Sequence, residues 1–227
     1  MPGRPTAPLG VEMNWISIAD VYLTGGETLT LRQSGDVFEI RLGLYQLMAS
    51  GNSVSERVLA SITCAGCCDG TVLIGGLGLG YTVRAVLDTV GPDARVTVAE
   101  LVPQIVDWNR GLLAHLAGRP LDDPRVEVMV ADVADIVRAR PGGFDAILLD
   151  VDNGPDAVLF QGNSFLYTAD GVRLLLSGLK PGGVLAVWAA TPSPAFEKVL
   201  ETCGFPYRRR TVAVLERLTH TIYLVGR

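Results

Sequence analysis

The stretch Val72-Leu-Ile-Gly-Gly-Leu-Gly-Leu-Gly-Tyr81 decides how the rest of the chain is interpreted. Its apolar beginning, residues 72–74, is typical of the end of a buried parallel strand. Gly76, Gly78 and Gly80 then allow the backbone a tight turn before a helix begins. A strand, a glycine-rich turn and a helix in this order are typical of a nucleotide-binding loop.

The segment Arg95-Val-Thr-Val-Ala-Glu100 predicts a second strand that ends in a carboxylate. Glu100 follows the glycines by about twenty residues, the distance at which such folds place the acid that holds a ribose. A carboxylate there can accept hydrogen bonds from both ribose hydroxyls; the alternative is a solvated acid before a helix that opens at Pro103. Together, the glycines and Glu100 predict a nucleotide site.

The spacing of the glycines indicates the class of ligand. A dinucleotide loop has its third glycine three positions after the second, but Gly76, Gly78 and Gly80 are evenly spaced and Tyr81 fills the dinucleotide position. Even spacing favours a ligand like S-adenosylmethionine, which has no pyrophosphate and which the backbone must approach closely. The alternative is that the glycines only permit a tight turn.

Composition argues against several classes of function. The 227 residues are 48% apolar and 19% charged with a formal net charge of -5, which is typical of a soluble globular protein and unfavourable for a nucleic-acid surface. The one basic cluster, Arg208-Arg209-Arg210, is expected on an exposed strand or loop. Because we find neither a signal peptide nor a membrane-spanning run, we expect a cytoplasmic protein without a nucleic-acid or membrane partner.

The cysteines do not predict a metal site. The four cysteines are Cys64, Cys67, Cys68 and Cys203. A zinc site would need a second close pair, and the two histidines, His115 and His220, are remote in sequence. We therefore expect reduced thiols with a structural or incidental role.

The N-terminal region, residues 1–52, is expected to contain an arm and a small antiparallel β region. Residues 1 to about 26 predict a loose arm with a short strand near residues 15–18. Segments 27–33 and 37–42 alternate like two strands and are joined by residues of hairpin-turn composition.

The second region, residues 53–227, is expected to be an S-adenosylmethionine-binding domain. Ser53-Val-Ser-Glu56 is a capping-box pattern that opens a helix through about Thr63. Strands and helices then alternate, which predicts a parallel sheet covered by helices on both faces, with ligands at the carboxyl ends of the strands. The expected strands are 71–75, 95–100, 125–130, 144–150 and 183–189, the expected helices are 82–90, 103–117, 133–139, 168–178 and 194–202, and 206–215 with 220–225 form an antiparallel hairpin at one edge.

Acidic residues follow two of the expected strands. Asp132 could accept from an adenine amino group or could simply cap a helix. Asp150, Asp152 and Asn153 follow the fourth strand, where a carboxylate in a partly dry pocket can act as a base or hold a cation. The alternative for these three is turn chemistry, and a Mg²⁺ site would lack a third well-spaced acid.

With these residues assembled, the chain resembles the spermidine synthase family, a branch of the class I S-adenosylmethionine-dependent methyltransferase fold. The matching segments are Ile74-Gly-Gly76, Val98-Ala-Glu100, Asp123-Pro-Arg-Val126 with Ala131-Asp132, Phe144-Asp-Ala-Ile-Leu-Leu-Asp150, Gly154-Pro155 with Leu159-Phe160, and Leu179-Lys-Pro-Gly-Gly183. The resemblance implies an α/β, Rossmann-like fold with a seven-stranded sheet whose last strand is antiparallel, preceded by a small N-terminal β-hairpin region. It also implies ribose recognition by Glu100, adenine recognition by Asp132 and a homodimer.

These considerations give a set of candidate site residues. We assign cofactor binding to Gly76, Gly78, Gly80, Glu100, Leu101, Asp132, Val133 and Asp150. We assign catalysis to Asp150 and Asp152, and substrate binding to Tyr45, Gln46, Tyr81 and Asn153, with Trp108 as a further candidate for lining the site.

The chain departs from the family pattern at three places. Aminopropyltransferases of this family carry an acid inside the glycine loop where this chain has Gly78. Their paired acids after the fourth strand are three apart, whereas here Asn153 takes the second place and Asp152 stands one residue early. Their Tyr-His-Glu segment is represented only by Val54-Ser55-Glu56. A diamine needs several anions to hold its two ammonium groups, and some are missing.

The leading expectation is therefore methyl transfer from S-adenosylmethionine to a small-molecule acceptor held near Asp150 and Asp152, with positioning and a dry pocket supplying most of the rate. Three alternatives stay open. They are aminopropyl transfer from decarboxylated S-adenosylmethionine, cyclisation or elimination of the cofactor's amino-acid chain, and a non-catalytic nucleotide-binding module.

Overall fold

The computed structural model describes residues 14–23, 25–66, 69–216 and 218–226. The chain forms two compact units, the first ending at Gly51 and the second beginning at Asn52. The expectations for the first thirteen residues, and those for Cys67 and Cys68, fall outside the described ranges. Within those ranges, no helix is long and apolar enough to cross a membrane.

The first unit is a four-stranded antiparallel sheet in the order β1-β2-β3-β4. Its strands are β1 Ile16–Tyr22, β2 Thr28–Ser34, β3 Val37–Leu42 and β4 Tyr45–Ala49. Alternation along β2 and β3 buries one set of side chains, among them Leu29, Leu31 and Ile40. The predicted hairpin and the short strand expected near residues 15–18 are confirmed. That strand is longer than expected, Ile16–Tyr22, and pairs with β2, so the loose arm is wrong for residues 19–22. The sequence analysis also missed β4.

The second unit contains a seven-stranded sheet in the order β10-β11-β9-β8-β5-β6-β7. Its strands are β5 Thr71–Gly75, β6 Arg95–Glu100, β7 Val126–Val130, β8 Phe144–Leu149, β9 Leu179–Ala189, β10 Tyr207–Leu215 and β11 Leu218–Val225. The five strands from β9 to β7 are parallel, and β11 runs antiparallel to both β9 and β10. This arrangement confirms the predicted seven-stranded sheet with an antiparallel last strand.

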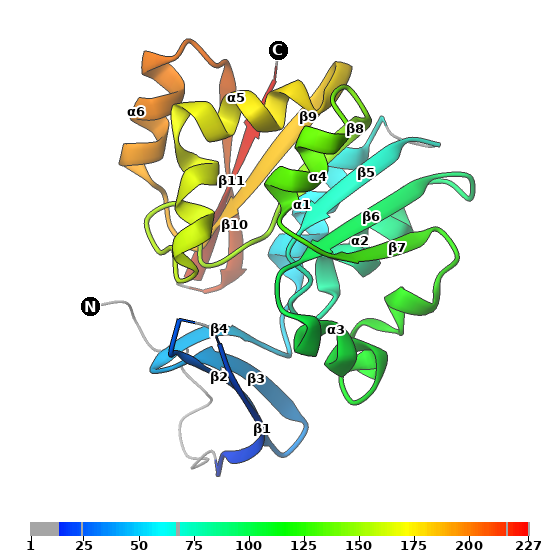
Figure 1. Ribbon diagram of the computed structural model, residues 1–227, viewed down its shortest axis with the longest axis vertical. Coiled ribbons are helices and arrows are strands. Elements are labelled where there is room, and N and C mark those ends of the chain that lie inside the picture. Colours follow the sequence, from blue (N-terminus) through cyan, green and yellow to red (C-terminus); the bar gives the residue numbers. More distant parts are fainter. Residues whose placement is uncertain (1–13, 24, 67–68, 217, 227) are drawn as a thin grey trace. The chain divides into compact units, whose positions relative to one another are not determined.

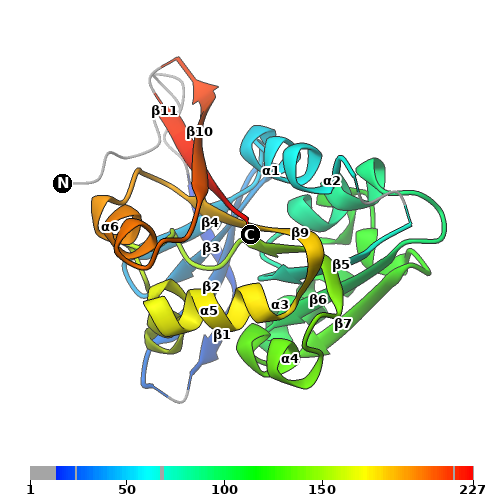
Figure 2. The ribbon, with the colours of Figure 1, turned by 90° about the horizontal axis from the view of Figure 1, so that it is seen from above.

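Helices cover both faces of this sheet (Figure 1). They are α1 Val54–Cys64, α2 Tyr81–Thr89, α3 Pro103–Arg110, α4 Val133–Ala139, α5 Ala169–Ser177 and α6 Pro194–Thr202. Figure 2 shows α1 and α2 together on one face, and α4 and α5 on the other. The central strand β5 is covered from both sides, and its Val72, Leu73 and Ile74 have no exposed surface. A continuous apolar run is what such a strand requires.

The predicted helix over residues 103–117 is wrong as a single helix. Helix α3 ends at Arg110, and Gly111 leaves helical geometry with φ −112° and ψ −107°. A 3-10 helix, Ala114–Ala117, and a second, Pro120–Asp122, follow. Another 3-10 helix, Gln161–Tyr167, precedes α5 and was not predicted. Short 3-10 segments lack the periodicity that identifies an α-helix in a sequence.

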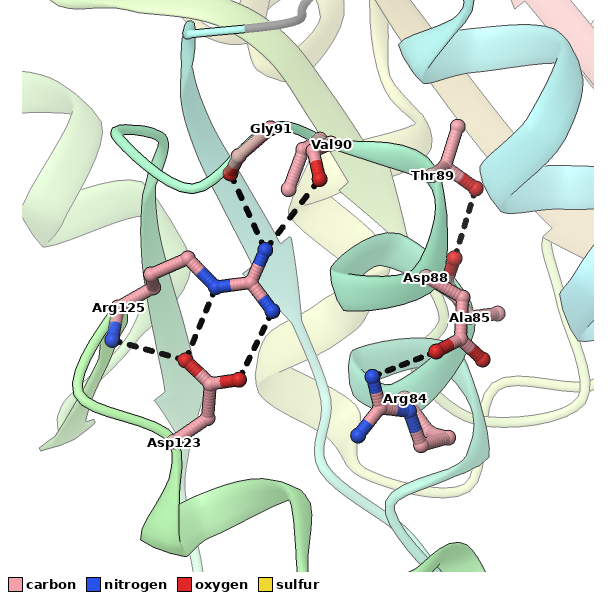
Figure 3. A network of polar contacts seen from close by, with 8 residues as sticks. All are labelled: Arg84, Ala85, Asp88, Thr89, Val90, Gly91, Asp123 and Arg125. Atoms are coloured by element: carbon pink, nitrogen blue, oxygen red, sulfur yellow. Dashed lines mark hydrogen bonds and ion pairs between the residues drawn. The ribbon is translucent and has the colours of Figure 1, made fainter.

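A polar network connects the loop after α2 to the beginning of β7 (Figure 3). The Arg125 guanidinium donates to both carboxylate oxygens of Asp123, at 2.9 and 2.8 Å, and to the carbonyls of Val90 and Gly91. The hydrogen bonds from Arg125 lower the pKa of Asp123 to about 2. This network fixes the end of the sheet remote from the glycine-rich loop.

Candidate functional site

The glycine-rich loop joins β5 to α2, and its backbone conformation requires glycine. Gly76, Gly78 and Gly80 have φ values of 90°, 53° and 82°, a region that residues with a side chain rarely adopt. A Cβ on Gly76 would lie 2.2 Å from the carbonyl oxygen of Asp150. The loop therefore brings bare backbone against the end of the neighbouring strand β8, as expected for close approach to a ligand.

Glu100 lies at the end of β6 and is buried beside this loop. Its Oε2 accepts from the Leu77 N–H and its Oε1 from the Val102 N–H, both at 2.9 Å. Burial raises the pKa of Glu100, and these backbone donors oppose that rise. Each carboxylate oxygen keeps further acceptor capacity, so Glu100 beside this loop fits a nucleoside with two adjacent hydroxyls. The neighbouring Leu101 is exposed.

Asp132 and Val133 lie where β7 passes into α4. The Asp132 side chain caps α4 by accepting from the Ala134 N–H at 2.8 Å. This is the capping alternative of the sequence analysis, and it leaves the other carboxylate oxygen for any adenine contact. Val133 is buried, and a Cβ on Gly75 would lie 3.2 Å from its Cγ2.

Asp150 follows β8 directly and is partly buried. Its backbone N–H donates to the Gly75 carbonyl at 2.9 Å, and its Oδ2 accepts from the Thr82 hydroxyl. Burial and the negative charge of Glu56 raise the pKa of Asp150 to about 7, against the hydrogen bond from Thr82. A carboxyl with this pKa, beside a nucleotide loop, can accept a proton near neutral pH.

Asp152 fixes the loop that follows β8. Its φ is 52°, its Oδ1 accepts from the Phe160 N–H at 3.1 Å, and its Oδ2 accepts from the Asn163 side chain at 2.7 Å. Burial raises the pKa of Asp152. Both oxygens hold the segment that leads into the 3-10 helix, so Asp152 anchors a loop, which is the turn alternative of the sequence analysis.

The remaining candidates are placed on several elements. The Asn153 carbonyl accepts from the Ala190 N–H at 3.1 Å, which joins the loop after β8 to the end of β9. Tyr81 opens α2 and Trp108 lies on α3, both partly buried. Tyr45 and Gln46 lie on β4 of the first unit.

Sequence reasoning misjudged Glu56. The capping box predicted for Ser53 is wrong, because the Ser53 side chain makes no cap hydrogen bond and Asn52 Oδ1 accepts from the Val54 N–H instead. Glu56 accepts from the Ser55 hydroxyl at 2.8 Å, and burial raises its pKa. The resemblance of Val54-Ser55-Glu56 to a family segment was the signal that could have identified it.

Sequence reasoning also missed Asn109. Its side-chain amide on α3 donates to the Gly78 carbonyl at 2.8 Å and to the Ile105 carbonyl at 2.9 Å. Asn109 thus holds the middle of the glycine-rich loop. Nothing in its sequence context marks it, because the contact joins segments 31 residues apart.

The described ranges contain no group of three or more His, Cys, Asp or Glu side chains arranged to hold a metal ion. Within the same ranges, Cys64 is buried and Cys203 is partly buried.

Comparisons with known proteins agree with this fold. Residues 62–202 match the model of the spermine/spermidine synthase domain. A polyamine aminopropyltransferase of Mycobacterium tuberculosis is 32% identical over 138 residues, which cover 58% of this chain and 25% of that protein. Polyamine aminopropyltransferase 2 of Pseudomonas aeruginosa is 35% identical over 120 residues, 51% of this chain and 32% of that protein. Putrescine N-methyltransferase 1 of Nicotiana tabacum is 32% identical over 121 residues, which cover 52% of this chain and 30% of that protein. The matched part is thus a quarter to a third of each relative.

Solved structures show the same fold. A spermidine synthase in complex with the transition state analogue AdoDATO superposes with a TM-score of 0.72 at 20% identity, covering 92% of this chain and 71% of that chain. Spermidine synthase from Thermotoga maritima superposes with a TM-score of 0.70 at 19% identity, covering 92% of this chain and 72% of that chain. Since the family model spans more than half of the sequence, the chain belongs to the spermine/spermidine synthase domain family.

Proposed function

We propose that the protein transfers an aminopropyl group from decarboxylated S-adenosylmethionine to a small amine. The observation that carries this proposal is the Asp150 carboxyl, which follows β8, accepts a hydrogen bond from the Thr82 hydroxyl at the beginning of α2, and has a pKa raised to about 7. The family and the aminopropyltransferase relatives favour aminopropyl transfer over methyl transfer, the leading expectation from the sequence.

In this proposal, different residues bind the nucleoside and accept the proton. The glycine-rich loop, Glu100 and Asp132 bind and orient the nucleoside, so that the carbon to be transferred faces the amine. Asp150 accepts the proton that the amine nitrogen loses as the N–C bond forms and the C–S bond breaks. Because the sulfonium leaving group is already activated, positioning and one proton acceptor supply the chemistry.

Methyl transfer is the second candidate, favoured by Gly78. This position lacks the acid that aminopropyltransferases of the family use, so the loop offers no side chain for the aminopropyl ammonium. One of the relatives is named a putrescine N-methyltransferase.

A direct competition distinguishes the candidates. The protein is incubated with putrescine and either S-adenosylmethionine or its decarboxylated form, and products are identified by mass spectrometry. We expect an aminopropylated amine and tighter calorimetric binding of the decarboxylated form. A methylated amine would overturn the proposal in favour of methyl transfer. Methylthioadenosine without a transferred group indicates cyclisation or elimination, and binding without turnover indicates a binding module.

The resemblance also leads us to propose a homodimer. Light scattering coupled to size-exclusion chromatography tests this, with a monomer mass at micromolar concentration as the contrary result.

A further inference from the structure

A chain of hydrogen bonds runs from His220 on β11 to the first turn of α1. His220 Nδ1 lies 2.9 Å from Ser55 Oγ, and the Ser55 hydroxyl donates to Glu56 Oε2 at 2.8 Å. Ser55 is 1% exposed, and His220 is partly buried with its ring at 4.8 Å, edge to face, from that of Trp188. Since β11 runs antiparallel to β9, His220 near its beginning lies at the carboxyl ends of the parallel strands, where Asp150 also lies.

The direction of this chain follows from its donors. The Ser55 hydroxyl has a single hydrogen, which it donates to Glu56. Ser55 Oγ can then only accept from His220, so His220 carries its proton on Nδ1. Burial lowers the pKa of His220, which keeps the imidazole neutral at pH 7. The chain therefore presents aligned donors to the Glu56 carboxylate.

The other end of the chain is coupled to the proposed acceptor site. The charge of Glu56 raises the pKa of Asp150, so the two carboxyls disfavour simultaneous ionisation. Of the charged groups on α1 and on the elements that pack against it, Arg57 lowers the pKa of Glu56. The others are paired with one another or exposed: Arg84 with Asp88, Lys180 with Asp145, Arg209 with Glu197, and the exposed Arg208 and Arg210.

We propose that Ser55 and His220 are positioning residues for the acceptor amine: they orient Glu56 so that it and Asp150 form one two-carboxyl site for an ammonium group. The inference rests on the proposed function, which it deepens by naming the acceptor site. Two partly buried carboxyls repel each other without a cation, and an ammonium group between them satisfies both through charge-assisted hydrogen bonds.

The donor and acceptor roles in this chain of hydrogen bonds can also be reversed. When Glu56 is protonated, its O–H donates to Ser55, the Ser55 hydroxyl donates to His220 Nδ1, and the neutral imidazole takes the Nε2–H form by exchange with solvent. Binding of an ammonium group ionises both carboxyls and returns the chain to the Nδ1–H direction. The tautomer of His220 therefore reports occupation of the site.

Histidine NMR tests this without turnover. The sequence has two histidines, and the exposed His115 serves as reference, with His115→Gln giving the assignment. In spectra recorded across a pH series that spans the titration of Glu56, whose pKa burial raises, we expect putrescine to shift the His220 tautomer of the wild type towards Nδ1–H, and we expect no shift in Ser55→Ala. An unchanged His220 spectrum on adding putrescine to the wild type, or an equal shift in Ser55→Ala, would overturn the proposal.

Steady-state kinetics provide a second test of the positioning role. We expect Ser55→Ala and His220→Leu to raise KM for the amine about ten-fold, the effect of one hydrogen bond to a charged group, with little change in KM for the nucleotide. Without the Ser55 donor Glu56 is more often protonated, so Asp150 loses a negative neighbour and the acid limb of kcat/KM moves to lower pH. His220→Asn, which keeps a donor near the Nδ1 position, should restore most of both parameters.

The outcomes separate the two proposals. A wild type that turns over no amine contradicts the proposed function, while the histidine spectra still decide the positioning role. An active enzyme whose KM for the amine and pH profile are the same in the wild type and His220→Leu contradicts the positioning role alone.

Discussion

Gly76 is a residue at which both the fold and the candidate site depend on the absence of a side chain. Its φ of 90° is unfavourable for alanine, and an added Cβ would lie 2.2 Å from the Asp150 carbonyl oxygen. We expect Gly76→Ala to lower the free energy of unfolding by about 3 kcal/mol or more, the sum of backbone strain and a steric conflict. Urea denaturation monitored by circular dichroism measures this loss.

Gly182 provides a matched control for Gly76. It has a similar φ of 82°, but a Cβ there would meet nothing within 4 Å. Gly182→Ala should therefore lower the free energy of unfolding only through backbone strain, by about 1 kcal/mol. Equal losses for the two variants would show that the contact with Asp150 does not matter.

Asp150 is a residue at which function opposes stability. Its pKa is raised to about 7, so the fold favours the protonated form, and stability falls as pH rises from the ordinary aspartate range to about 7. Asp150→Asn removes this titration. We expect the Tm of the variant at pH 8 to exceed that of the wild type by about 2–4 °C, which corresponds to a gain of ~1 kcal/mol in the free energy of unfolding for a protein of this size. The difference in Tm should be smaller at pH 5.

Thermal scans between pH 5 and pH 8, together with aminopropyl transfer assays, test this prediction. The variant should lose most activity, because an amide cannot accept the proton. Asp93→Asn, at an exposed position, serves as the control and should leave the pH dependence of Tm unchanged. A wild type and an Asp150→Asn variant with parallel Tm profiles would contradict the raised pKa.

At the scale of elements, α3 supports the glycine-rich loop through Asn109. This side chain is 2% exposed and donates to the carbonyls of Gly78 and Ile105. We expect Asn109→Ala to lower the free energy of unfolding by about 1–3 kcal/mol, because two carbonyls lose their donor. It should also weaken binding of methylthioadenosine, since the loop is less well held, and calorimetry measures the change.

Asp107 supplies the control for this helix. Its side chain is exposed on α3, and Asp107→Ala changes neither the loop nor the buried face. Binding of methylthioadenosine that falls equally in both variants would indicate a general loosening of α3 and not the specific support of Gly78.

Elements with strong local patterns were predictable from the sequence. Strands β5 and β8 are predominantly apolar, β6 carries Val96 and Val98 in alternation, and Pro at the first position of α3 and α6 marks where these helices begin. The end of α3 was not predictable, because residues 112–117 continue with helix-forming side chains while the backbone turns at Gly111. Strand β4 has no clear alternation of apolar and polar residues, although it pairs with β3 across a short turn at residues 43–44.

The candidate site was predictable to a similar degree. Glycines and acids at strand ends are visible in a sequence because the topology fixes what lies beside them, as at Gly76, Glu100 and Asp150. The partners of Asp152 and Glu56 were not visible. Asp152 anchors a loop through Asn163, and Glu56 is coupled to Asp150 across the fold, so both depend on contacts between distant segments.

At the scale of the whole molecule, the groups proposed to bind the nucleoside all belong to the second unit. The loop at Gly76, Glu100 and Asp132 lie between Asn52 and the C-terminus, and this unit has its own hydrophobic core. We expect a protein consisting of residues 52–227 to fold and to bind methylthioadenosine with an affinity close to that of the full chain.

Calorimetry on the two proteins checks this expectation, with circular dichroism confirming that the shorter one is folded. Glu100→Ala in the shorter protein is the control for specific binding. A folded shorter protein that does not bind the nucleoside would show that the first unit contributes to that site.

The strand β10 has a consequence for the behaviour of the protein in concentrated solution. It lies at the edge of the sheet, and edge strands expose backbone groups that can pair with another chain. Its exposed Arg208, Arg209 and Arg210 make this edge basic on both faces, with Arg209 also paired with Glu197. Two copies that met edge to edge would bring these charges together, so the arginine triplet opposes growth of the sheet from one molecule into the next and protects the protein against fibril formation.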